Sequence, residues 1–598
     1  MDTQKYSVNQ HLIETLLAFA KSGEIAIPEI QRPFVWDSTK VRDLMDSLYH
    51  GYPVGYIIVW KNPNVRLKDG STSQGKKVLI DGQQRVTALS AAILGESVID
   101  KNYREVQIRI AFNPKHERFE VRNPAIEKSK EWIPDISPVL QGELGLLKLV
   151  RNYLQANPDT NEDDMERVFT KLLSLTRRQI GLIELDADLD IETVTEIFIR
   201  INSKGVVLSQ ADFVMSKIAT NESHGGNDLR KAIDYFCHLA VAPEFFPFLR
   251  DNDKRFAKTD LFKRMAWLKH ENDDLYDPSY SDMLRVAFMC HFGRARLGEL
   301  VALLSGRNFE TREYEAAIEE ESFDKLREGV MDFMSETNFK RFVMIIKSAG
   351  FVVSKLIRAQ SPLNFAYTLY LKLKRDKYSA DEIEHYLRRW FVLSMLTGRY
   401  SSSPETRFDQ DIREIDQRPF GEYLELIESA ELSSVFWDVG LVQGLTTSSV
   451  NHPAFGVFLA AQAKMADRGF LSKEITVRDM LEHRGDVHHV YPSAYLKRQG
   501  LTRSRYNQVA NYAYMQSEIN IAVSDAPPDE YLATVQKQCD NGTAKIGGIT
   551  DCDDLKRNFE ENAVPLSLLK GSPIEFEDFL EERRKLMAQK IRKYYESL

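Results

Sequence analysis

Residues 486–492 read Asp-Val-His-His-Val-Tyr-Pro, and two asparagines, Asn511 and Asn520, follow them in the chain. Two adjacent histidines in a valine-flanked, strand-like stretch are costly to bury without partners. One histidine can take a proton from water, while nitrogen and oxygen ligands hold a divalent metal and an amide orients the base. A metal-assisted phosphodiesterase needs this set of residue types, so the sequence predicts that the C-terminal part cuts nucleic acid.

Basic residues follow the histidine pair closely. Four of them are candidate DNA-binding residues: Lys497, Arg498, Arg503 and Arg505. A second basic cluster near the end of the chain is interpreted either as part of such a groove or as the solvated face of a helix; it consists of Arg583, Arg584, Lys585, Lys590, Arg592 and Lys593. The formal net charge of −9 argues mildly against a nucleic-acid-binding protein, but it does not exclude a local basic groove.

A second candidate site lies about four hundred residues upstream, in the turn from Asp81 to Arg85. An expected strand over residues 77–80 and an expected helix over 86–95 flank this turn. Free amide groups at a helix N-terminus attract anions, and Arg85 adds a permanent positive charge, so the turn is interpreted as a phosphate site. The alternative is an ordinary strand–helix turn that Asp81 caps. A Walker-type loop is excluded because no Gly-Lys-Ser/Thr follows.

Other segments must position these two sites. The expected N-terminal elements are a helix over 9–24, an extended connector over 27–37, a helix over 41–51, a strand over 54–60, a hairpin over 105–122, helices over 147–178 and a strand over 179–185. A further helix ends near Gly205, where Arg200 and Asn202 either reach a ligand or satisfy the helix end. Residues 211–440 show helical periodicity.

Length and composition limit the class of protein. At 598 residues the chain is too long for one core, so we expect three segments, 1–215, 216–440 and 441–598. No run of about 18 apolar residues occurs and the N-terminus lacks the pattern of a signal peptide, so no membrane partner is expected. Four cysteines without CxxC spacing favour a reducing cytoplasm over a structural zinc site.

Two sets of motifs resemble a known family. The first set is IQRPFVW at 30–36, GYIIVW at 55–60, IDGQQRVT at 80–87 and FIRINSKG at 198–205; the second is HHVYP at 488–492, Asn511, Asn520 and PPDEY at 527–531. The first set resembles the GmrS-like domain of the ParB/sulfiredoxin-like fold. The second set resembles the GmrD-like His-Me finger (HNH) nuclease. In this order the two resemble the GmrSD-type modification-dependent (type IV) restriction endonucleases.

The resemblance implies a multidomain α+β protein. Its N-terminal domain is expected to have a ParB/sulfiredoxin-like α/β fold and its middle to be largely α-helical. The C-terminal part is expected to be a ββα-metal (HNH) nuclease domain embedded in helices.

The same resemblance implies roles for the C-terminal residues. In His-Me nucleases a histidine at the end of the first strand is the general base, which here is His489, and the residue before it, His488, is a metal ligand. Asn511 matches the position that orients the base, and Asn520 matches the second ligand. Asp486 is an additional or alternative ligand, although strand alternation places it opposite His489. The expected metal is Mg²⁺ or Mn²⁺, with Ni²⁺ as an alternative because imidazole is a soft ligand.

For the N-terminal domain the resemblance implies nucleotide binding and hydrolysis, with GTP, ATP, CTP and UTP all left open. The expected nucleotide-binding residues are Gln31, Arg32, Asp81, Gly82, Gln83, Gln84, Arg85, Arg200 and Asn202.

Taken together, these features predict a cytoplasmic phage-defence endonuclease whose nucleotide turnover controls cutting. Its expected substrate is double-stranded DNA that carries hydroxymethylated or glucosylated cytosine, or a phosphorothioate backbone. Two alternatives stay open: a nucleotide-controlled regulator that only binds nucleic acid, and a toxin-like nuclease that acts on RNA or unmodified DNA. The oligomeric state is also open, with a homodimer among the options.

Overall fold

The protein is described by a computed structural model that covers residues 5–26, 36–61, 77–99, 105–187, 189, 193–194, 209–271, 273–483, 485–571 and 573–598, without the side chains of residues 78, 216, 220, 222 and 486. The chain forms two compact units, Met1–Arg230 with Val301–Ile318, and Lys231–Leu300 with Glu319–Leu598. Both α-helices and β-strands are present, and helix predominates. The expected division into segments 1–215, 216–440 and 441–598 stays a prediction.

The first unit is organised around a mixed five-stranded sheet with the strand order β1-β9-β3-β4-β2. Its strands are β1 (Tyr6–Leu12), β2 (Ile25–Ala26), β3 (Tyr56–Lys61), β4 (Lys77–Asp81) and β9 (Gln179–Leu185). Strand β9 pairs antiparallel with β1 and parallel with β3, while β4 pairs antiparallel with β3. The predicted strand over 179–185 is confirmed at both ends, and the strand predicted over 54–60 is observed two residues later at its start.

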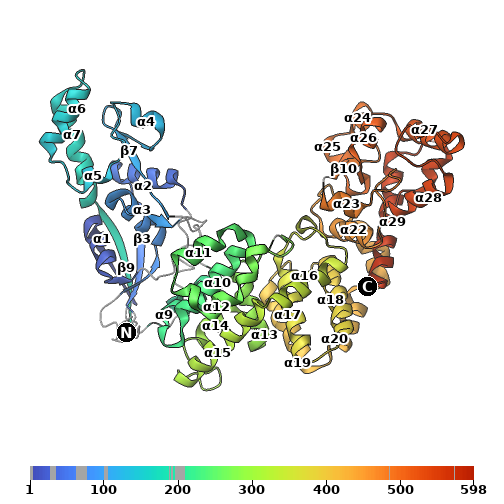
Figure 1. Ribbon diagram of the computed structural model, residues 1–598, viewed down its shortest axis with the longest axis horizontal. Coiled ribbons are helices and arrows are strands. Elements are labelled where there is room, and N and C mark those ends of the chain that lie inside the picture. The colour runs from blue at the N-terminus through green and yellow to red at the C-terminus, as the bar shows by residue number, and fades with distance from the viewer. Residues whose placement is uncertain are drawn as a thin grey trace. The chain divides into compact units, whose positions relative to one another are not determined.

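Three helices, α1 (Ile13–Ser22), α2 (Ser38–His50) and α3 (Gln83–Leu94), lie beside this sheet (Figure 1). Their buried residues share one apolar core with Ile57, Val59, Ile180 and Leu182 of the strands. Asp37 caps α2 by accepting from the Lys40 amide (2.8 Å). The helix predicted over 9–24 is wrong at its start, because residues 9–12 belong to β1, which is held by its pairing with β9.

Smaller elements complete the first unit. The predicted hairpin over 105–122 is observed as β7 (Ile110–Asn113) and β8 (Arg118–Val121), preceded by the short pair β5 (Val98–Ile99) and β6 (Glu105–Val106). The helical region predicted over 147–178 is confirmed by α6 (Leu146–Ala156) and α7 (Glu162–Leu173). The other helices are α4 (Pro124–Lys128), α5 (Ser137–Leu140) and α9 (Gln210–Thr220).

The helical periodicity of residues 211–440 is confirmed. The helices of this region after α9 are α10 (Gly226–Val241), α11 (Phe246–Asn252), α12 (Asp260–Arg264), α13 (Tyr280–Phe292), α14 (Leu297–Leu303), α15 (Ala316–Phe333), α16 (Glu336–Ser348), α17 (Gln360–Arg375), α18 (Ala380–Thr397), α19 (Pro404–Gln417) and α20 (Phe420–Glu431). A buried ion pair between Arg399 and Asp411 (2.6 Å) joins α19 to the segment that follows α18. None of the described helices is long and apolar enough to cross a membrane.

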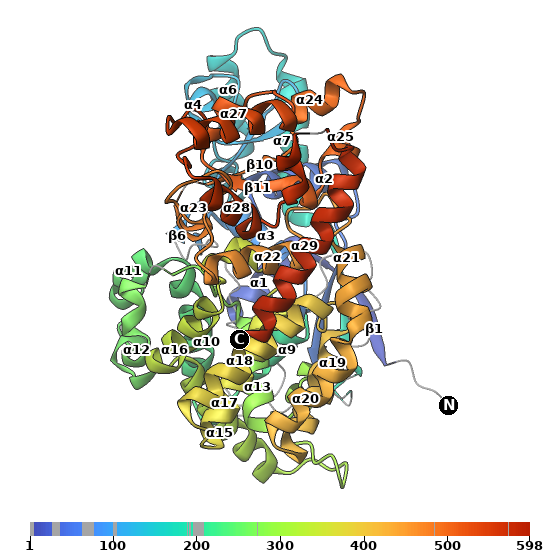
Figure 2. The same cartoon turned by 90° about the vertical axis from the view of Figure 1, so that its right-hand side faces the viewer.

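The C-terminal part of the second unit contains a two-stranded hairpin, β10 (Asp486–His489) and β11 (Tyr512–Met515), followed by α26 (Ser517–Val523). This is the strand–strand–helix order expected there. The surrounding helices are α21 (Leu441–Gly444), α22 (Pro453–Lys464), α23 (Val477–Glu482), α24 (Ser493–Arg498), α25 (Arg503–Tyr506), α27 (Pro528–Asn541), α28 (Cys552–Glu561) and α29 (Phe576–Glu596). Helix α29 runs beside α22 in the second view (Figure 2).

Candidate active site

The β10–β11 register assigns each histidine to one face of the hairpin. His489 lies opposite Tyr512, and His488 lies opposite Ala513. Because successive side chains of a strand point to opposite faces, His489 shares its face with Val487, Tyr512 and Tyr514, and His488 points to the other face. The two imidazoles therefore have different surroundings.

The His489 ring forms a hydrogen bond with Asn507. Its Nε2 atom lies 3.0 Å from the Asn507 Oδ1 atom. The ring also contacts Tyr512 and Tyr506 edge-on, with centroid distances of 5.3 and 6.2 Å. Burial lowers the pKa of His489 below its ordinary value; the hydrogen bond to Asn507 opposes this shift, and the charges of His488 and Lys497 add to it. A lowered pKa keeps the ring neutral near pH 7.

Asn511 is fully buried and binds backbone groups, not the His489 ring. Its Oδ1 atom accepts from the Tyr491 amide at 2.8 Å, and its Nδ2 group donates to the carbonyls of Tyr491 (3.1 Å) and Tyr506 (3.2 Å). Its own carbonyl accepts from the Val490 amide (2.9 Å). The Asn511 side chain thus fixes Tyr491, and its backbone carbonyl fixes Val490, so any effect on the base is transmitted through the backbone.

Two further buried side chains hold this backbone. The hydroxyl of Tyr531, on α27, donates to the Val490 carbonyl at 2.9 Å. Arg583, on α29, is fully buried and donates to the carbonyls of Ala510 (2.9 Å) and Tyr512 (2.8 Å) on either side of Asn511. Both strand ends near His489 are therefore anchored from helices that come later in the chain.

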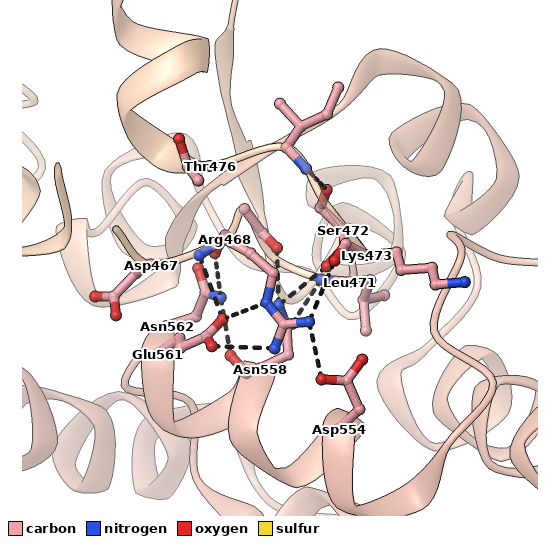
Figure 3. Close-up of polar contacts among 12 residues, drawn as sticks. Asp467, Arg468, Leu471, Ser472, Lys473, Thr476, Asp554, Asn558, Glu561 and Asn562 are labelled. Carbon is pink, nitrogen blue, oxygen red and sulfur yellow. Dashed lines mark hydrogen bonds and ion pairs between the residues drawn. The ribbon is translucent and has the colours of Figure 1, made fainter. Parts of the chain in front are cut away.

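An arginine-centred network fixes the loop that pairs with the back of β11. The Arg468 guanidinium lies between Glu561 (3.0 Å) and Asp554 (2.9 Å) of α28 (Figure 3). The Asn558 side chain accepts a hydrogen bond from the Leu471 amide (2.8 Å) and donates one to the Gly469 carbonyl (3.0 Å). This loop in turn donates from the Phe470 amide to the Tyr514 carbonyl of β11 (2.8 Å). The network thus stiffens the hairpin from the side opposite β10.

The expected metal ligands lie on the hairpin and the helix after it. His488 is half-buried on β10, and its cross-strand neighbour Ala513 contributes only a methyl group. Asn520 is half-buried on α26. The backbone of Asp486 pairs with Met515, but its side chain lies outside the described atoms. Among the described residues, no three His, Cys, Asp or Glu side chains are grouped closely enough to hold a metal ion. An imidazole and an amide oxygen are donors that fit a divalent transition metal.

The basic residues after the hairpin divide into two pairs. Lys497 lies over the Tyr506 ring, with its Nζ atom 5.7 Å from the centroid, and its charge acts on His489. The charge of Arg503 acts on Tyr512, the cross-strand neighbour of His489. Arg498, in contrast, pairs with Asp525, and Arg505 pairs with Glu577 (3.0 Å).

The structure does not favour the interpretation of the terminal basic cluster, residues 583–593, as part of a DNA-binding groove. Arg583 is buried, and Lys590 forms a largely buried ion pair with Asp467 (2.6 Å). Lys585 and Arg592 make exposed ion pairs one helical turn away, with Glu581 and Glu596. Arg583 and Lys590 thus hold α29 against its neighbours, while Lys585 and Arg592 form part of its solvated face.

In the first unit, the predicted strand–turn–helix from β4 to α3 is confirmed. Gly82 occupies the N-cap of α3 with φ +96°, and a Cβ there would lie 3.1 Å from the Ile57 side chain, so the turn needs glycine. The N-cap glycine has no side chain with which to cap α3, and Asp81 pairs with Arg85 (3.5 Å). Arg85 also donates to the Tyr56 carbonyl. Gln83 and Gln84 form the first turn of α3.

Four expected nucleotide-binding residues, Gln31, Arg32, Arg200 and Asn202, lie outside the described residues. In the part of the chain that is described, the sequence interpretation did not identify Asn507, Tyr531 or Arg583 as supports of the histidine strand. The PPDEY motif contains Tyr531 and could have indicated it. Asn507 and Arg583 carry no such signal, because one lies in a loop and the other in a basic cluster that looks exposed.

Comparison with known proteins supports part of this picture. Residues 13–219 match the family described as the N-terminal domain of the GmrSD restriction endonuclease. The match covers strands β2, β3, β4 and β9 of the sheet and the β4–α3 turn, and it ends before the β10–β11 hairpin. It supports a GmrSD-type protein and suggests a nuclease activity directed at DNA in a restriction-type defence function. An uncharacterized protein of Methanocaldococcus jannaschii is 21% identical over 629 aligned residues, which span 96% of this chain and 97% of that protein.

Proposed function

We propose that this chain is a type IV restriction endonuclease that hydrolyses modified foreign DNA at an HNH site under nucleotide control. The observation that carries the proposal is the environment of His489. A largely neutral imidazole is held at a strand end, and the following backbone is fixed by Asn511 and Tyr531. Such preorganisation is what a general base for phosphodiester hydrolysis requires.

His489 is the proposed base, and Asn507 selects its tautomer. With the Asn507 Oδ1 atom accepting from Nε2–H (3.0 Å), the lone pair of the neutral ring resides on Nδ1. Nδ1 takes the proton of the attacking water, and the positive ring that forms keeps its hydrogen bond to Asn507. Lys497 and Arg503 bind the DNA phosphates on this face. His488 and Asn520, with Asp486, would hold a divalent metal, which would supply stabilisation of charge on the phosphate and the leaving oxygen. Because His488 points to the face opposite His489, the phosphate would have to lie at the end of β10, where it meets both faces.

The pH dependence of cleavage tests the assignment of the base. Because the pKa of His489 is lowered, kcat/KM is expected to rise with pH through a value below 6.5 and to be flat above it. Asn507→Asp places a carboxylate beside the ring and favours its protonated form, so the inflection moves to higher pH and activity at pH 7 falls. The control is Asn541→Asp, the same charge change at the exposed end of α27. An inflection that Asn507→Asp leaves in place would contradict the assignment.

We further propose that the β4–α3 turn binds the nucleotide that controls cutting. The turn places backbone amides at the N-terminus of α3 near Arg85, an arrangement that suits phosphate oxygens. Gln31, Arg32, Arg200 and Asn202 are assigned to the same pocket by the motifs that they belong to. Control of this kind has a physical rationale, because an HNH site grips the phosphodiester and reads bases poorly.

Matched phage DNAs test the function as a whole. Purified protein is given plain, hydroxymethylated, glucosylated and phosphorothioated DNA, with Mg²⁺, Mn²⁺ or Ni²⁺ and with or without each nucleoside triphosphate. We expect cleavage of at least one modified DNA, little cleavage of plain DNA, and a rate that changes with one nucleotide. Equal cleavage of plain DNA or RNA would instead support the toxin-like alternative, and binding without cleavage would support the regulator.

A further inference from the structure

A small cavity lies on the same face of the hairpin as His489. Its volume is about 100 Å³, and its polar and aromatic lining consists of Lys355, Asn451, His452, Phe455 and Tyr514, with Val487 beside them. Val487 and Tyr514 are cross-strand partners two residues from the pair of His489 and Tyr512. Two residues of strand span about 7 Å, so the cavity lies about 7 Å along the hairpin from the proposed base.

The cavity is built by close packing of the segment Ser354–Leu356 against α22. Gly456 permits this contact, because a Cβ at that position would lie 2.7 Å from the Leu356 carbonyl oxygen. The packing places the exposed Lys355 over Tyr514, with Nζ 5.6 Å from the ring centroid. A lysine in this position keeps its positive charge at the mouth of the cavity while its stem covers the ring.

The remaining polar side chains of the lining, His452 and Asn451, can each donate a hydrogen bond into the cavity. His452 is the N-cap of α22, and its Nδ1 atom accepts from the Ala454 amide at 3.3 Å. Burial lowers the pKa of His452, so its ring is neutral and carries its proton on Nε2. Asn451 adds a side-chain amide. None of the described lining residues is Asp or Glu, and an ammonium, an imidazole N–H and an amide suit an anionic oxygen.

We propose that this cavity is a phosphate subsite that holds the nucleic-acid strand beside the bond that His489 hydrolyses. The proposal rests on the proposed nuclease function and adds Lys355 and His452 to its binding residues. The volume corresponds to about three waters at liquid density, which is close to one phosphate group. Since 7 Å is the axial rise of about two nucleotides, the bound phosphate lies within two nucleotides of the cleaved bond. Lys497 and Arg503 then bind the strand near the base, beyond this subsite.

The test measures binding separately from cleavage. The full chain carrying His489→Ala is titrated with duplex DNA over a series of salt concentrations, alone and with Lys355→Gln or His452→Ala. Lys537→Gln, the same charge change on the exposed face of α27, is the matched control. We expect Lys355→Gln to raise Kd about tenfold and to reduce the slope of log K against log salt by about 1. The control stays within about twofold. An unchanged Kd and slope in the Lys355 variant would overturn the subsite.

Two further arms separate this proposal from its alternatives. A methylphosphonate placed in turn at each phosphate within two nucleotides of the cleaved bond is expected to weaken wild-type binding at one position, and Lys355→Gln removes that sensitivity. If wild-type protein cleaves DNA but no position shows this behaviour, the subsite is wrong and the nuclease stands. If no DNA is cleaved, the nuclease and the subsite fail together. If Lys355→Gln abolishes competition by inorganic phosphate without weakening strand binding, the cavity is a site for a free anion and the proposal is overturned.

Discussion

DNA cleavage by the His489→Ala protein is expected to be about 10²–10⁴-fold slower than by the wild type, the range that a positioned general base contributes. The rate of a single turnover at saturating DNA measures this effect directly. DNA affinity is expected to change little, because the phosphate-binding residues Lys497 and Arg503 remain. The clamp on the following backbone also remains, since Asn511 and Tyr531 contact Val490 and Tyr491 and not the imidazole.

The matched control is His483→Ala, which removes an exposed histidine at the end of α23. It is expected to cleave at the wild-type rate. If His489→Ala nicks plasmid as fast as the wild type in Mg²⁺ or Mn²⁺, another group is the base and the assignment is wrong. If both histidine variants lose activity and also melt at lower temperature, the loss reflects folding, and the single-turnover comparison must be repeated with His489→Gln.

Sequence patterns predicted those parts of the fold that are set by local chemistry. The strand at 179–185 is a short, mainly apolar run, and the turn at 81–85 is a polar stretch with a glycine between an apolar strand and an apolar helix; both are observed where expected. The helices of residues 211–440 follow from their 3.6-residue periodicity. The helix predicted over 9–24 includes residues 9–12 because nothing local marks them as a strand. Their conformation depends on pairing with β9, about 170 residues later in the chain.

The candidate site also has a part that local sequence predicts and a part that only the folded chain shows. The hairpin that carries the histidines and the helix after it could be predicted from the motif, but the partners of each side chain could not. Asn507 lies four residues before the asparagine expected to act on the base, and only the folded loop brings its oxygen to His489. Arg583 looks like a surface charge, yet it binds carbonyls about 70 residues upstream. Sequence periodicity does not show which buried backbone groups lack a partner within a helix or sheet and therefore need a side chain such as Arg583.

Asn511→Ala is expected to cause the largest combined loss of stability and activity among single substitutions of the site. The change leaves the Tyr491 amide and the carbonyls of Tyr491 and Tyr506 without these buried partners. At about 1–3 kcal/mol for each of the three unsatisfied groups, the cost is on the order of 3–9 kcal/mol, a large share of a typical domain stability of about 5–15 kcal/mol. Thermal or urea unfolding of the full chain measures it, with Asn541→Ala at the exposed end of α27 as the control.

Asn511→Asp distinguishes a broken hydrogen-bond clamp from simple loss of side-chain volume. The aspartate keeps an acceptor for the Tyr491 amide, but its second oxygen faces two carbonyls and can donate to one only when it is protonated. Its pKa in the folded protein is therefore raised above that of the unfolded chain, and the variant gains stability relative to the wild type as pH falls from 7 toward 5. Asn511→Ala has no such group, so its deficit stays constant over the same range. If the aspartate variant shows the same pH-independent deficit as the alanine variant, the buried donor–acceptor pairing does not hold the His489 strand.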